Sequence, residues 1–371
     1  MRETIDDRFY MELALGMAAK TAGQTGINPA VGCVVVKDGR IVGLGAHLKR
    51  GEGHAEVHAL AMAGEEARGA TAYVTLEPCS HYGRTPPCSD RLIAAGIARV
   101  VVAELDPNPL VSGTGMAKLQ AAGIETEAGV MEAEARRRSE PFRKFITTRL
   151  PYVTLKTAST LDGRIATASG DSRWVTGPEA RAAVHAMRHR HMGILVGIGT
   201  VLADDPSLTT RLDVPGLHPV RIVADSALRL PLDSKLVRDG AAPTIALASG
   251  AADEGRAEAL RAAGVEVIRC GIGASVELQE AMRLLGEREI GSILLEGGGR
   301  LNGSMLAAGL VDRICVFLAP KIIGGEDAPS SFRFAGFERM ADAIELDDVE
   351  VERYGRDVCI SGKPAAGGGI G

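Results

Sequence analysis

Helical and strand-like spacings of apolar residues alternate along the first 150 residues of the chain. A four-residue recurrence that begins at Phe9 predicts an amphipathic helix ending near Gly23. Two strand-like runs follow at residues 31–37 and 40–47, and the Asp-Gly pair between them suits the tight turn of a hairpin. The alternation continues through a helix, a strand, a second helix and a second strand, at residues 54–68, 72–76, 87–95 and 99–103. This pattern predicts a sheet with helices on both faces.

A charged helical stretch at residues 131–148 ends this region, and a new strand is expected at 152–156, directly after Pro151. We therefore predict two α/β domains, residues 1–147 and 148–371, with a flexible tail from about residue 364. Further strands are expected near Gly193, Val220, Val265, Ser292 and Asp312, and helices near Pro178, Asp253 and Arg300. The arginines of the charged stretch favour a solvated helix over an anion site.

Composition and charge exclude several classes of protein. The 42 basic and 47 acidic side chains give a net charge of −5, and residues 1–150 hold 18 of each, so neither half is typical of a nucleic-acid binder. Apolar runs are too short to span a bilayer. Six cysteines are too few for a disulfide scaffold, and the first ten residues lack the basic and apolar regions of a secretory leader. We therefore expect a cytoplasmic protein whose partners are neither nucleic acid nor membrane.

One histidine and two cysteines have the arrangement of a catalytic metal site. His54 precedes a predicted helix, and Cys79 and Cys88 lie between a predicted strand and the next helix. An imidazole and two thiolates bind zinc and leave a fourth position for water, which is the catalytic set of ligands rather than the structural one. Bound zinc lowers the pKa of that water, and a carboxylate that is not a ligand can carry its proton to a leaving amine. Glu56 is placed for that role, so the sequence predicts a zinc-dependent deaminase.

These residues allow two other interpretations. His54 and His58 are four residues apart on one helix face and could form a metal pair, although the glutamate between them is not where zinc proteases have it. His81 or Cys33 could supply a fourth ligand and make the site structural. The cysteines on strand-like patterns are expected to be small buried residues, namely Cys33, Cys270, Cys315 and Cys359.

The motifs around this site resemble those of one known family. The run from Thr75 to Cys88, TLEPCSHYGRTPPC, follows HAEVH at residues 54–58 and NPAVG at residues 28–32. Together they resemble the bifunctional riboflavin biosynthesis deaminase-reductases, whose cysteines are nine residues apart instead of the three of other base deaminases. The resemblance implies an N-terminal αβα domain with the cytidine deaminase-like fold. That domain would hydrolyse the 2-amino group of 2,5-diamino-6-(5-phosphoribosylamino)pyrimidin-4-one.

The same resemblance implies roles for individual residues of the first domain. Zn²⁺ would be bound by His54, Cys79 and Cys88. Glu56 would be the catalytic proton shuttle. The pyrimidine or its ribose phosphate would be bound by Asn28, His47, His81 and Arg84. A guanidinium suits a phosphate, whereas a structural role for either histidine is equally compatible with the sequence.

Three glycines between a strand and a helix in the second half suggest a phosphate-binding turn. Residues 292–296 have the pattern of a buried strand, and Gly297 to Gly299 lead into a helix at 300–308. Backbone N–H groups in such a turn can approach a phosphate at the helix N-terminus. The Rossmann fingerprint is absent, because the patterns that begin at Gly197 and Gly297 lack its last glycine. A tight turn without a ligand would explain the three glycines equally well.

Three further motifs resemble the reductase half of the same family: LDGRIA at residues 161–166, SGDSRW at 169–174 and GTVLADDPSLTTR at 199–211. The resemblance implies a second αβα domain similar to dihydrofolate reductase, which binds NADPH without a Rossmann fingerprint. That domain would reduce the ribosyl group of 5-amino-6-(5-phosphoribosylamino)uracil to ribityl. NADPH would contact Ala158, Trp174, Thr200, Asp204, Ser226, Gly298, Gly299, Arg300, Leu301, Asn302, Gly303 and Ser304. The substrate would contact Ser172, Arg188, Leu208, Arg211 and Glu296.

Structural alternatives remain for two residues of the second half. Trp174, the only tryptophan, could be a core residue, and Asp162 could be a turn residue before Gly163 rather than a catalytic one. Arg188 and Arg211 are chemically suited to a ribose phosphate. As partners we expect small phosphoribosylaminopyrimidines and further copies of the chain in a dimer or tetramer, with Zn²⁺ and NADPH as cofactors.

Overall fold

Contacts within the chain divide it into two units, Met1–Arg149 and Leu150–Gly371, and each is described by itself. The computed structural model describes residues 4–82, 86–109 and 111–365. No helix within these ranges is long and apolar enough to cross a membrane. Most of the tail that the sequence predicts to be flexible, residues 366–371, lies outside the described residues.

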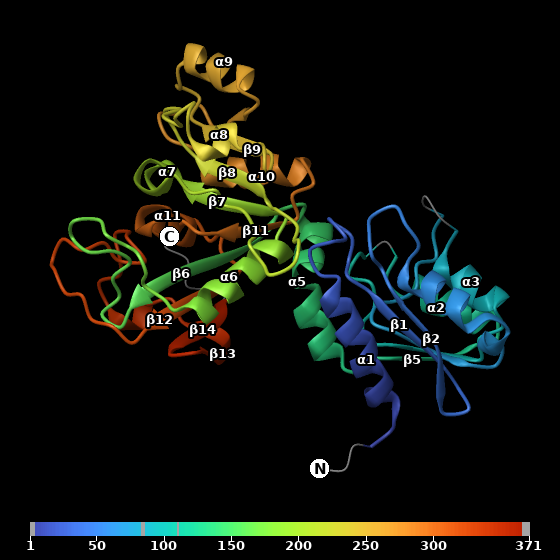
Figure 1. Ribbon diagram of the computed structural model, residues 1–371. Helices are drawn as coiled ribbons and strands as arrows, with labels where there is room; N and C mark the ends of the chain where they lie inside the picture. Colours follow the sequence, from blue (N-terminus) through green and yellow to red (C-terminus); the bar gives the residue numbers. More distant parts are fainter. Residues whose placement is uncertain (1–3, 83–85, 110, 366–371) are drawn as a thin grey trace. The chain divides into compact units, whose positions relative to one another are not determined.

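In the described part of the first unit, a five-stranded sheet lies between two layers of helices (Figure 1). The strand order is β2-β1-β3-β4-β5, in which β3, β4 and β5 run parallel and β1 is antiparallel to both of its neighbours. The elements are α1 (Asp7–Lys20), β1 (Gly32–Lys37), β2 (Arg40–Ala46), α2 (Ala55–Ala63), the 3-10 helix η1 (Gly64–Ala67), β3 (Thr71–Val74), α3 (Cys88–Ala94), β4 (Arg99–Val102), α4 (Thr114–Ala121), β5 (Glu125–Ala128) and α5 (Glu132–Thr148).

Side chains of this sheet alternate between its two faces, as strand geometry requires. Tyr73 and Val101 pack with α1 and α5. Their neighbours in sequence, Val74 and Val102, point to the other face and pack with α2, α3 and α4. The prediction of a sheet covered by helices on both faces is confirmed.

Helix α2 lies directly on the sheet because β2 has glycines beneath it. A Cβ atom on Gly45 would stand 2.0 Å from the carbonyl oxygen of Ala55, and one on Gly43 would stand 2.2 Å from that of Ala59. No side chain of any size therefore separates the strand from the helix. This close approach fixes the depth of the first turn of α2, which follows His54.

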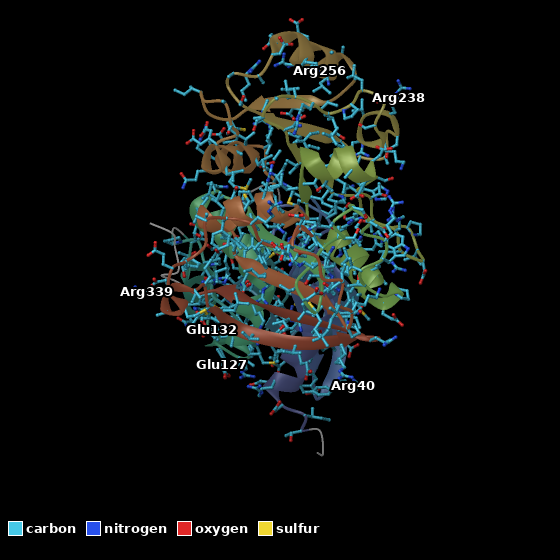
Figure 2. The ribbon with its side chains drawn as sticks, turned by 90° about the vertical axis from the view of Figure 1, so that its left-hand side faces the viewer. Arg40, Glu127, Glu132, Arg238, Arg256 and Arg339 are labelled. Atoms are coloured by element: carbon cyan, nitrogen blue, oxygen red, sulfur yellow. The ribbon has the colours of Figure 1, made fainter. Side chains whose placement is uncertain are left out.

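Two arginines of α5 form ion pairs with glutamates along the helix surface. Arg136 and Arg138 each lie 2.7 Å from a glutamate four residues earlier, Glu132 and Glu134 respectively. Figure 2 shows Glu132 at the surface of the protein. Pairs at this spacing stabilise a helix slightly in solvent, so the predicted solvated face is observed here.

In the described part of the second unit, a nine-stranded sheet has the order β10-β9-β8-β7-β11-β6-β12-β14-β13. The strands from β10 to β12 are parallel, and β14 is antiparallel to both of its neighbours, β12 and β13. The elements are β6 (Tyr152–Thr160), α6 (Pro178–Arg190), β7 (Gly193–Gly197), α7 (Ile198–Asp204), β8 (Val220–Ala224), α8 (Lys235–Arg238), β9 (Thr244–Ala248), α9 (Glu254–Ala262), β10 (Glu266–Arg269), α10 (Leu278–Glu287), β11 (Ser292–Leu295), α11 (Gly299–Ala307), β12 (Arg313–Ala319), the 3-10 helix η2 (Met340–Asp342), β13 (Leu346–Tyr354) and β14 (Asp357–Pro364).

The central strands of this sheet are buried on both faces, which is typical of parallel sheets. Helices α10 and α11 pack on one face, and α7, α8 and α9 pack on the other. Because the carboxyl ends of parallel strands meet at one edge, the loops after β6, β7, β8 and β11 gather there. Three of the four cysteines predicted to be buried lie in this unit, and all four are buried and free.

Candidate active sites

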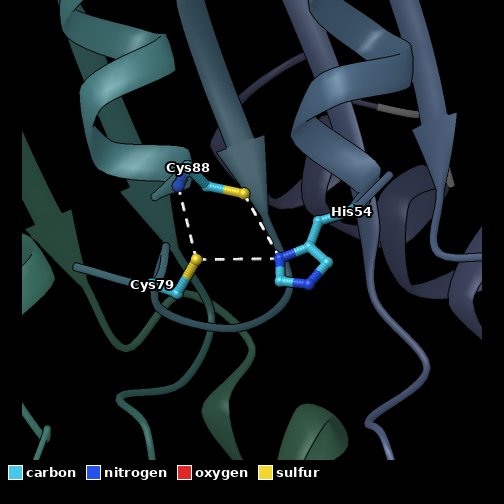
Figure 3. Close-up of side chains that lie close together, drawn as sticks. All are labelled: His54, Cys79 and Cys88. Atoms are coloured by element: carbon cyan, nitrogen blue, oxygen red, sulfur yellow. Dashed lines mark hydrogen bonds between the residues drawn. The ribbon is translucent and has the colours of Figure 1, made fainter. Parts of the chain in front are cut away.

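His54, Cys79 and Cys88 meet in the first unit, as the sequence predicts. Nδ1 of His54 lies 3.7 Å from Sγ of Cys79 and 3.3 Å from Sγ of Cys88 (Figure 3). Ligands bound at ~2.0–2.3 Å to a tetrahedral zinc ion are ~3.3–3.8 Å apart, so this spacing fits one zinc ion. Among the described residues this is the only cluster of three His, Cys, Asp or Glu side chains whose ligand atoms lie that close together. It includes none of the alternative ligands His58, His81 and Cys33.

Two helix starts surround these ligands. His54 is the N-cap of α2, and Cys88 is the first residue of α3 and donates its backbone N–H to Sγ of Cys79 at 3.3 Å. The hydrogen bond from the Cys88 thiol, together with that from His54, lowers the pKa of Cys79 to about 4. The same thiol–thiolate bond and burial raise the pKa of Cys88. Both sulfur atoms bind zinc as thiolates, so binding of the metal would be coupled to release of thiol protons.

Glu56 projects from the first turn of α2 and is almost fully buried, with 3% of its surface exposed. Burial raises the pKa of its carboxyl group. Its Oε2 atom has no hydrogen-bond partner among the described residues. A buried carboxylate oxygen without a partner carries a desolvation cost, which a proton or a bound ligand removes. The group is therefore suited to accept and return a proton beside the metal ligands.

A pocket of about 400 Å³ is lined by three of these four side chains, and Cys88 is not among its lining residues. The residues predicted from the sequence that line it are His54, Glu56, Cys79, Asn28, His47 and His81. Arg84 lies outside the described residues. Several other residues that were not expected from the sequence also line the pocket, among them Glu52, Glu77, Asp106, Asn108, Phe142 and Ile146. Two of these could have been predicted from the sequence. Asp106 and Asn108 are polar residues that closely follow a buried parallel strand, the position at which α/β sheets bind ligands.

Asn28 and His47 are joined on the pocket wall. The amide nitrogen of Asn28 donates to Nε2 of His47 at 3.2 Å, and Nδ1 of His47 donates to the carbonyl oxygen of Gly53 at 3.2 Å. One ring nitrogen accepts and the other donates, so this histidine is neutral. Burial lowers its pKa in agreement with that state. The ring is thus held in one orientation against the pocket.

In the second unit, Glu296 lies in a buried ion-pair cluster at the carboxyl end of β11. Its carboxylate accepts two hydrogen bonds from Arg188 of α6, at 2.7 and 3.0 Å, and one from Lys156 of β6 at 3.3 Å. The three side chains are only 10–14% exposed. Burial alone would raise the pKa of Glu296, but the charges of Arg188 and Lys156 outweigh it and hold that pKa well below its usual range. The cluster presents a fixed, ionised carboxylate.

Two further predicted residues lie on the loop that contacts this cluster. Arg188 also donates to the carbonyl oxygen of Thr209 at 3.1 Å, and the backbone N–H of Arg211 donates to Nδ1 of His185 at 3.2 Å. The guanidinium of Arg211 is at the surface. Leu208 is only 4% exposed and packs in the core, so its backbone is the part that can reach a substrate.

The predicted phosphate turn is at the N-terminus of α11. Gly298 is its N-cap, and nothing lies within 4 Å of a Cβ atom added there. A Cβ on Gly299 would stand 2.3 Å from the carbonyl oxygen of Ser330, so the turn is closely packed on one side and open on the other. Asn302 is fully buried and its Oδ1 has no partner among the described residues. Backbone N–H groups that face open space at a helix start fit a dinucleotide phosphate.

A purely structural role is possible from the sequence for both Trp174 and Asp162, and the structure supports it for Asp162 only. Trp174 is 61% exposed and therefore not a core residue, and the guanidinium of Arg181 lies 4.5 Å from its ring centroid. Asp162 accepts hydrogen bonds from Thr160 Oγ1 at 2.6 Å and from the N–H of Gly324 at 2.8 Å. These bonds lower the pKa of Asp162 to about 2 and give it a turn-stabilising role.

The other predicted residues of the second unit are spread over strands, helices and loops at and around the carboxyl edge of its sheet. Ser226 follows β8, and its Oγ accepts the backbone N–H of Val276 at 3.1 Å. The rest lie in β6, in an exposed loop, in α7 and in α11, and they are Ala158, Ser172, Thr200, Asp204, Arg300, Leu301, Gly303 and Ser304.

Comparisons with known proteins match both units. Residues 4–104 match the family model of the cytidine and deoxycytidylate deaminase zinc-binding region, and residues 151–360 match that of the RibD C-terminal domain. The riboflavin biosynthesis protein RibD of Aquifex aeolicus is 48% identical, over 95% of this chain and 97% of its own length. That of Escherichia coli is 45% identical, over 96% of this chain and 99% of its own length.

The chain belongs to the RibD family. Solved structures agree: RibD of Acinetobacter baumannii, 38% identical, superimposes with a TM-score of 0.85 over 97% of this chain and 99% of its own. A Thermotoga maritima structure, described as a diaminohydroxyphosphoribosylaminopyrimidine deaminase/5-amino-6-(5-phosphoribosylamino)uracil reductase, is 37% identical with a TM-score of 0.84, over 97% and 99% of the two chains.

RibD proteins are bifunctional, and this chain has both parts. It is a zinc-binding deaminase and a reductase of the NADPH-dependent type that acts in riboflavin biosynthesis. The ligand triad and the unpaired oxygen of Glu56 fit the zinc of the first activity. The open turn at Gly298 fits the cofactor of the second.

Proposed function

We propose that residues 1–147 hydrolyse the 2-amino group of 2,5-diamino-6-(5-phosphoribosylamino)pyrimidin-4-one. Residues 148–371 then reduce the ribosyl group of the product, 5-amino-6-(5-phosphoribosylamino)uracil, to ribityl. The Thermotoga maritima relative is described by these two activities. The single observation that carries the proposal is that the unpaired, buried carboxylate oxygen of Glu56 lies in the same pocket as His54 and Cys79.

In the deaminase, Glu56 moves the proton. His54, Cys79 and Cys88 would hold zinc, which when bound would supply a water molecule of lowered pKa. Glu56 would carry one proton of the attacking water to ring nitrogen N3 as the C2–O bond forms and the C2=N3 double bond opens, and would carry the second to the amino nitrogen as the bond from C2 to that nitrogen breaks. Ammonia leaves and a C2 carbonyl remains. The raised pKa of Glu56 suits a group that must hold a proton briefly near neutral pH.

Other residues of this pocket bind the substrate. The amide of Asn28, fixed by its hydrogen bond to His47, is placed to contact the pyrimidine edge. His81 also lines the pocket, and Arg84 is proposed as a phosphate ligand on the family resemblance alone. These contacts orient C2 toward Glu56, and orientation of this kind is a large part of catalysis.

In the reductase, the protein positions the sugar. NADPH supplies a hydride to C1′ of the ribose when it is bound. The C1′–O4′ bond breaks as O4′ takes a proton and the attached nitrogen forms a C=N bond to C1′, and addition of the hydride to C1′ then gives the ribityl chain. Arg188 holds the Glu296 carboxylate ionised and fixed, so that it accepts hydrogen bonds from the substrate, and the exposed guanidinium of Arg211 is suited to the phosphate.

The substitution Glu56→Gln tests the first half of this proposal. It keeps the size of the side chain but removes its ability to accept a proton, so deamination should fall by about 10²–10⁴-fold. Zinc content and reduction of the aminouracil intermediate should be unchanged, which makes the second activity an internal control. Deamination at the wild-type rate by this variant would refute the assigned role of Glu56.

We also propose that the enzyme is cytoplasmic and forms a homodimer or homotetramer. Six free cysteines, two of them needed as thiolates, favour a reducing compartment. Light scattering on the purified protein measures the mass of the assembly, and fractionation of the producing cells locates it. A monomeric mass at micromolar concentration would contradict the oligomer.

A further inference from the structure

Two buried glutamates at the carboxyl edge of the first sheet make contacts that the proposed reaction does not use. Glu77 follows β3 and Glu104 follows β4, and they are only 5% and 1% exposed. The backbone N–H of Glu77 donates to the carbonyl oxygen of Glu104 at 2.9 Å, so the two segments are joined. Cys79, a metal ligand, comes two residues after Glu77. Buried carboxylates are costly unless their oxygens are hydrogen-bonded, and the partners of these two are specific.

Glu77 accepts hydrogen bonds from backbone N–H groups of the segment after β4. Among the described residues, Oε2 accepts from Asp106 at 3.1 Å and Gly113 at 2.8 Å, and Oε1 accepts from Gly115 at 2.8 Å and Met116 at 3.3 Å. The last two donors are in the first turn of α4, so Glu77 caps that helix from a separate strand. The packing is tight as well, because a Cβ atom on Gly115 would stand 2.0 Å from the carbonyl oxygen of Pro78.

The segment held by Glu77 forms a polar wall of the pocket. Asp106 and Asn108 both line the pocket, and a carboxylate oxygen of Asp106 accepts the backbone N–H of Asn108 at 2.8 Å. Asp106 is thus fixed at its own N–H by Glu77 and at its side chain by its neighbour. The position of Asp106 and Asn108 relative to Cys79 therefore depends on the carboxylate of Glu77.

Glu104 holds a second wall in the same manner. Its carboxylate accepts a hydrogen bond from the hydroxyl of Ser139 at 2.8 Å and forms an ion pair with Arg143. Both partners belong to α5, and the apolar side chains of Phe142 and Ile146 on that helix line the pocket. The strand that carries Glu104 is hydrogen-bonded to the strand that leads to Cys79.

We propose that Glu77 and Glu104 are positioning residues that set the shape of the deaminase pocket for the pyrimidine ring, each through the wall that it holds. The proposal rests on the proposed deaminase function of this pocket. Glutamine cannot replace Glu77 in this role, because an amide offers one acceptor oxygen and turns two N–H donors toward the backbone N–H groups that the carboxylate accepted. Walls of this kind bind the ring equally in the ground state and in the transition state, so their loss affects KM more than kcat.

The test uses the full-length variants Glu77→Gln and Glu104→Gln. For Glu77→Gln, KM for the diaminopyrimidinone should rise about tenfold or more, with kcat within about threefold of wild type. Zinc content and the kcat and KM of the reductase, measured with the aminouracil, should be unchanged. Each variant is also combined with Glu56→Gln, which stops turnover. Calorimetric titration of the substrate into these double variants measures Kd, which should rise by the same factor as KM. Glu104→Gln keeps an acceptor for Ser139 but loses the charge that pairs with Arg143, so the rise in KM should be smaller.

Glu127→Gln is the matched control. Glu127 is on the surface of β5 (Figure 2). It pairs with Arg99 and does not line the pocket, so this variant removes the same charge from the same unit without touching the pocket. An unchanged KM in both pocket variants would overturn the proposal, and so would an equal rise in the control. Loss of zinc from Glu77→Gln would also overturn it, since Glu77 would then hold the ligands and not the wall. If Glu77→Gln does not fold, Glu104→Gln and Ser139→Ala decide the question alone. Absence of deamination by the wild-type enzyme would instead refute the proposed function itself.

Discussion

Arg188 donates two hydrogen bonds to the carboxylate of Glu296, at 2.7 and 3.0 Å, and the two side chains are only 12% and 10% exposed. A planar guanidinium matches the geometry of a carboxylate in a way that no other side chain does. Because the pair is buried, removal of one partner leaves the other as a charge that water cannot reach.

Replacement of Arg188 should therefore destabilise the second unit. Arg188→Met leaves only Lys156 beside Glu296, and the free energy of unfolding of this unit should fall by about 3–5 kcal/mol. Denaturant unfolding followed by the fluorescence of Trp174, the only tryptophan, measures this. The triple substitution Lys156→Met, Arg188→Met and Glu296→Leu removes all three charges of the cluster and should recover most of the loss. Equal stability of wild type and Arg188→Met would show that the pair contributes nothing.

His185 should make the second unit sensitive to acid. Burial, followed by the charges of Arg188 and Arg211, lowers the pKa of His185 from 6.5 to about 4, and Glu296 only partly opposes them. Between pH 6.5 and about 4 the unfolded chain therefore binds a proton at this histidine and the folded chain does not. The free energy of unfolding falls as the pH is lowered through that range. Nuclear magnetic resonance should report an imidazole pKa well below 6.5. Thermal unfolding of His185→Gln should lose less stability over the same pH range, and an ordinary imidazole titration near pH 6.5 would contradict the prediction.

A methyl group should destabilise the protein at Gly303 but not at Gly298, two glycines of the α11 region. A Cβ on Gly303 would stand 2.3 Å from the carbonyl oxygen of Arg333, so Gly303→Ala should lower the free energy of unfolding by about 1–3 kcal/mol despite the better helix propensity of alanine. Gly298→Ala meets nothing within 4 Å and should leave stability within about 0.5 kcal/mol. Its methyl group would stand in the space assigned to phosphate, so NADPH affinity should fall. Thermal unfolding and calorimetric titration separate the two effects, and unaltered NADPH binding by Gly298→Ala would place the phosphate elsewhere.

Removal of zinc should separate the two activities. Cys88→Ser, or treatment with a strong chelator, removes a thiolate ligand or the metal itself from the cluster with His54 and Cys79. Deamination should fall to background while reduction of the aminouracil with NADPH continues. Metal analysis beside both activity assays checks this result. Parallel loss of the reductase would mean that zinc stabilises the whole chain.

The ligand triad was predictable because local pattern places each member. His54 starts a helix, Cys88 starts another and Cys79 follows a buried strand, so topology alone brings them to one edge of the sheet. The family resemblance then added the substrates and the second cofactor. The fold class followed from the alternation of helices and strands with equal directness.

Other parts of the structure could not be predicted from local pattern. Strand β5, Glu125–Ala128, is mostly exposed and acidic, so it has no apolar alternation, and α4 is short with glycines at its start. The partners of Glu77 are backbone amides 29–39 residues away, which no side-chain motif records. The resemblance implies that Leu208 contacts the substrate, whereas its side chain is buried in the core, which the sequence pattern alone does not indicate.

The glycines beneath α2 also limit how this enzyme can evolve. Because Gly43 and Gly45 leave no space between β2 and the helix, substitutions on that surface cannot shift the proton-carrying side chain without a collision of main-chain atoms. A change of preferred substrate would therefore more readily arise in pocket residues outside α2, such as those in the segment after β4 and on α5. The residue proposed to carry the proton lies on α2, whereas the walls proposed to shape the pocket lie after β4 and on α5. Substitutions in those walls can therefore change substrate preference while the proton-carrying residue stays in place.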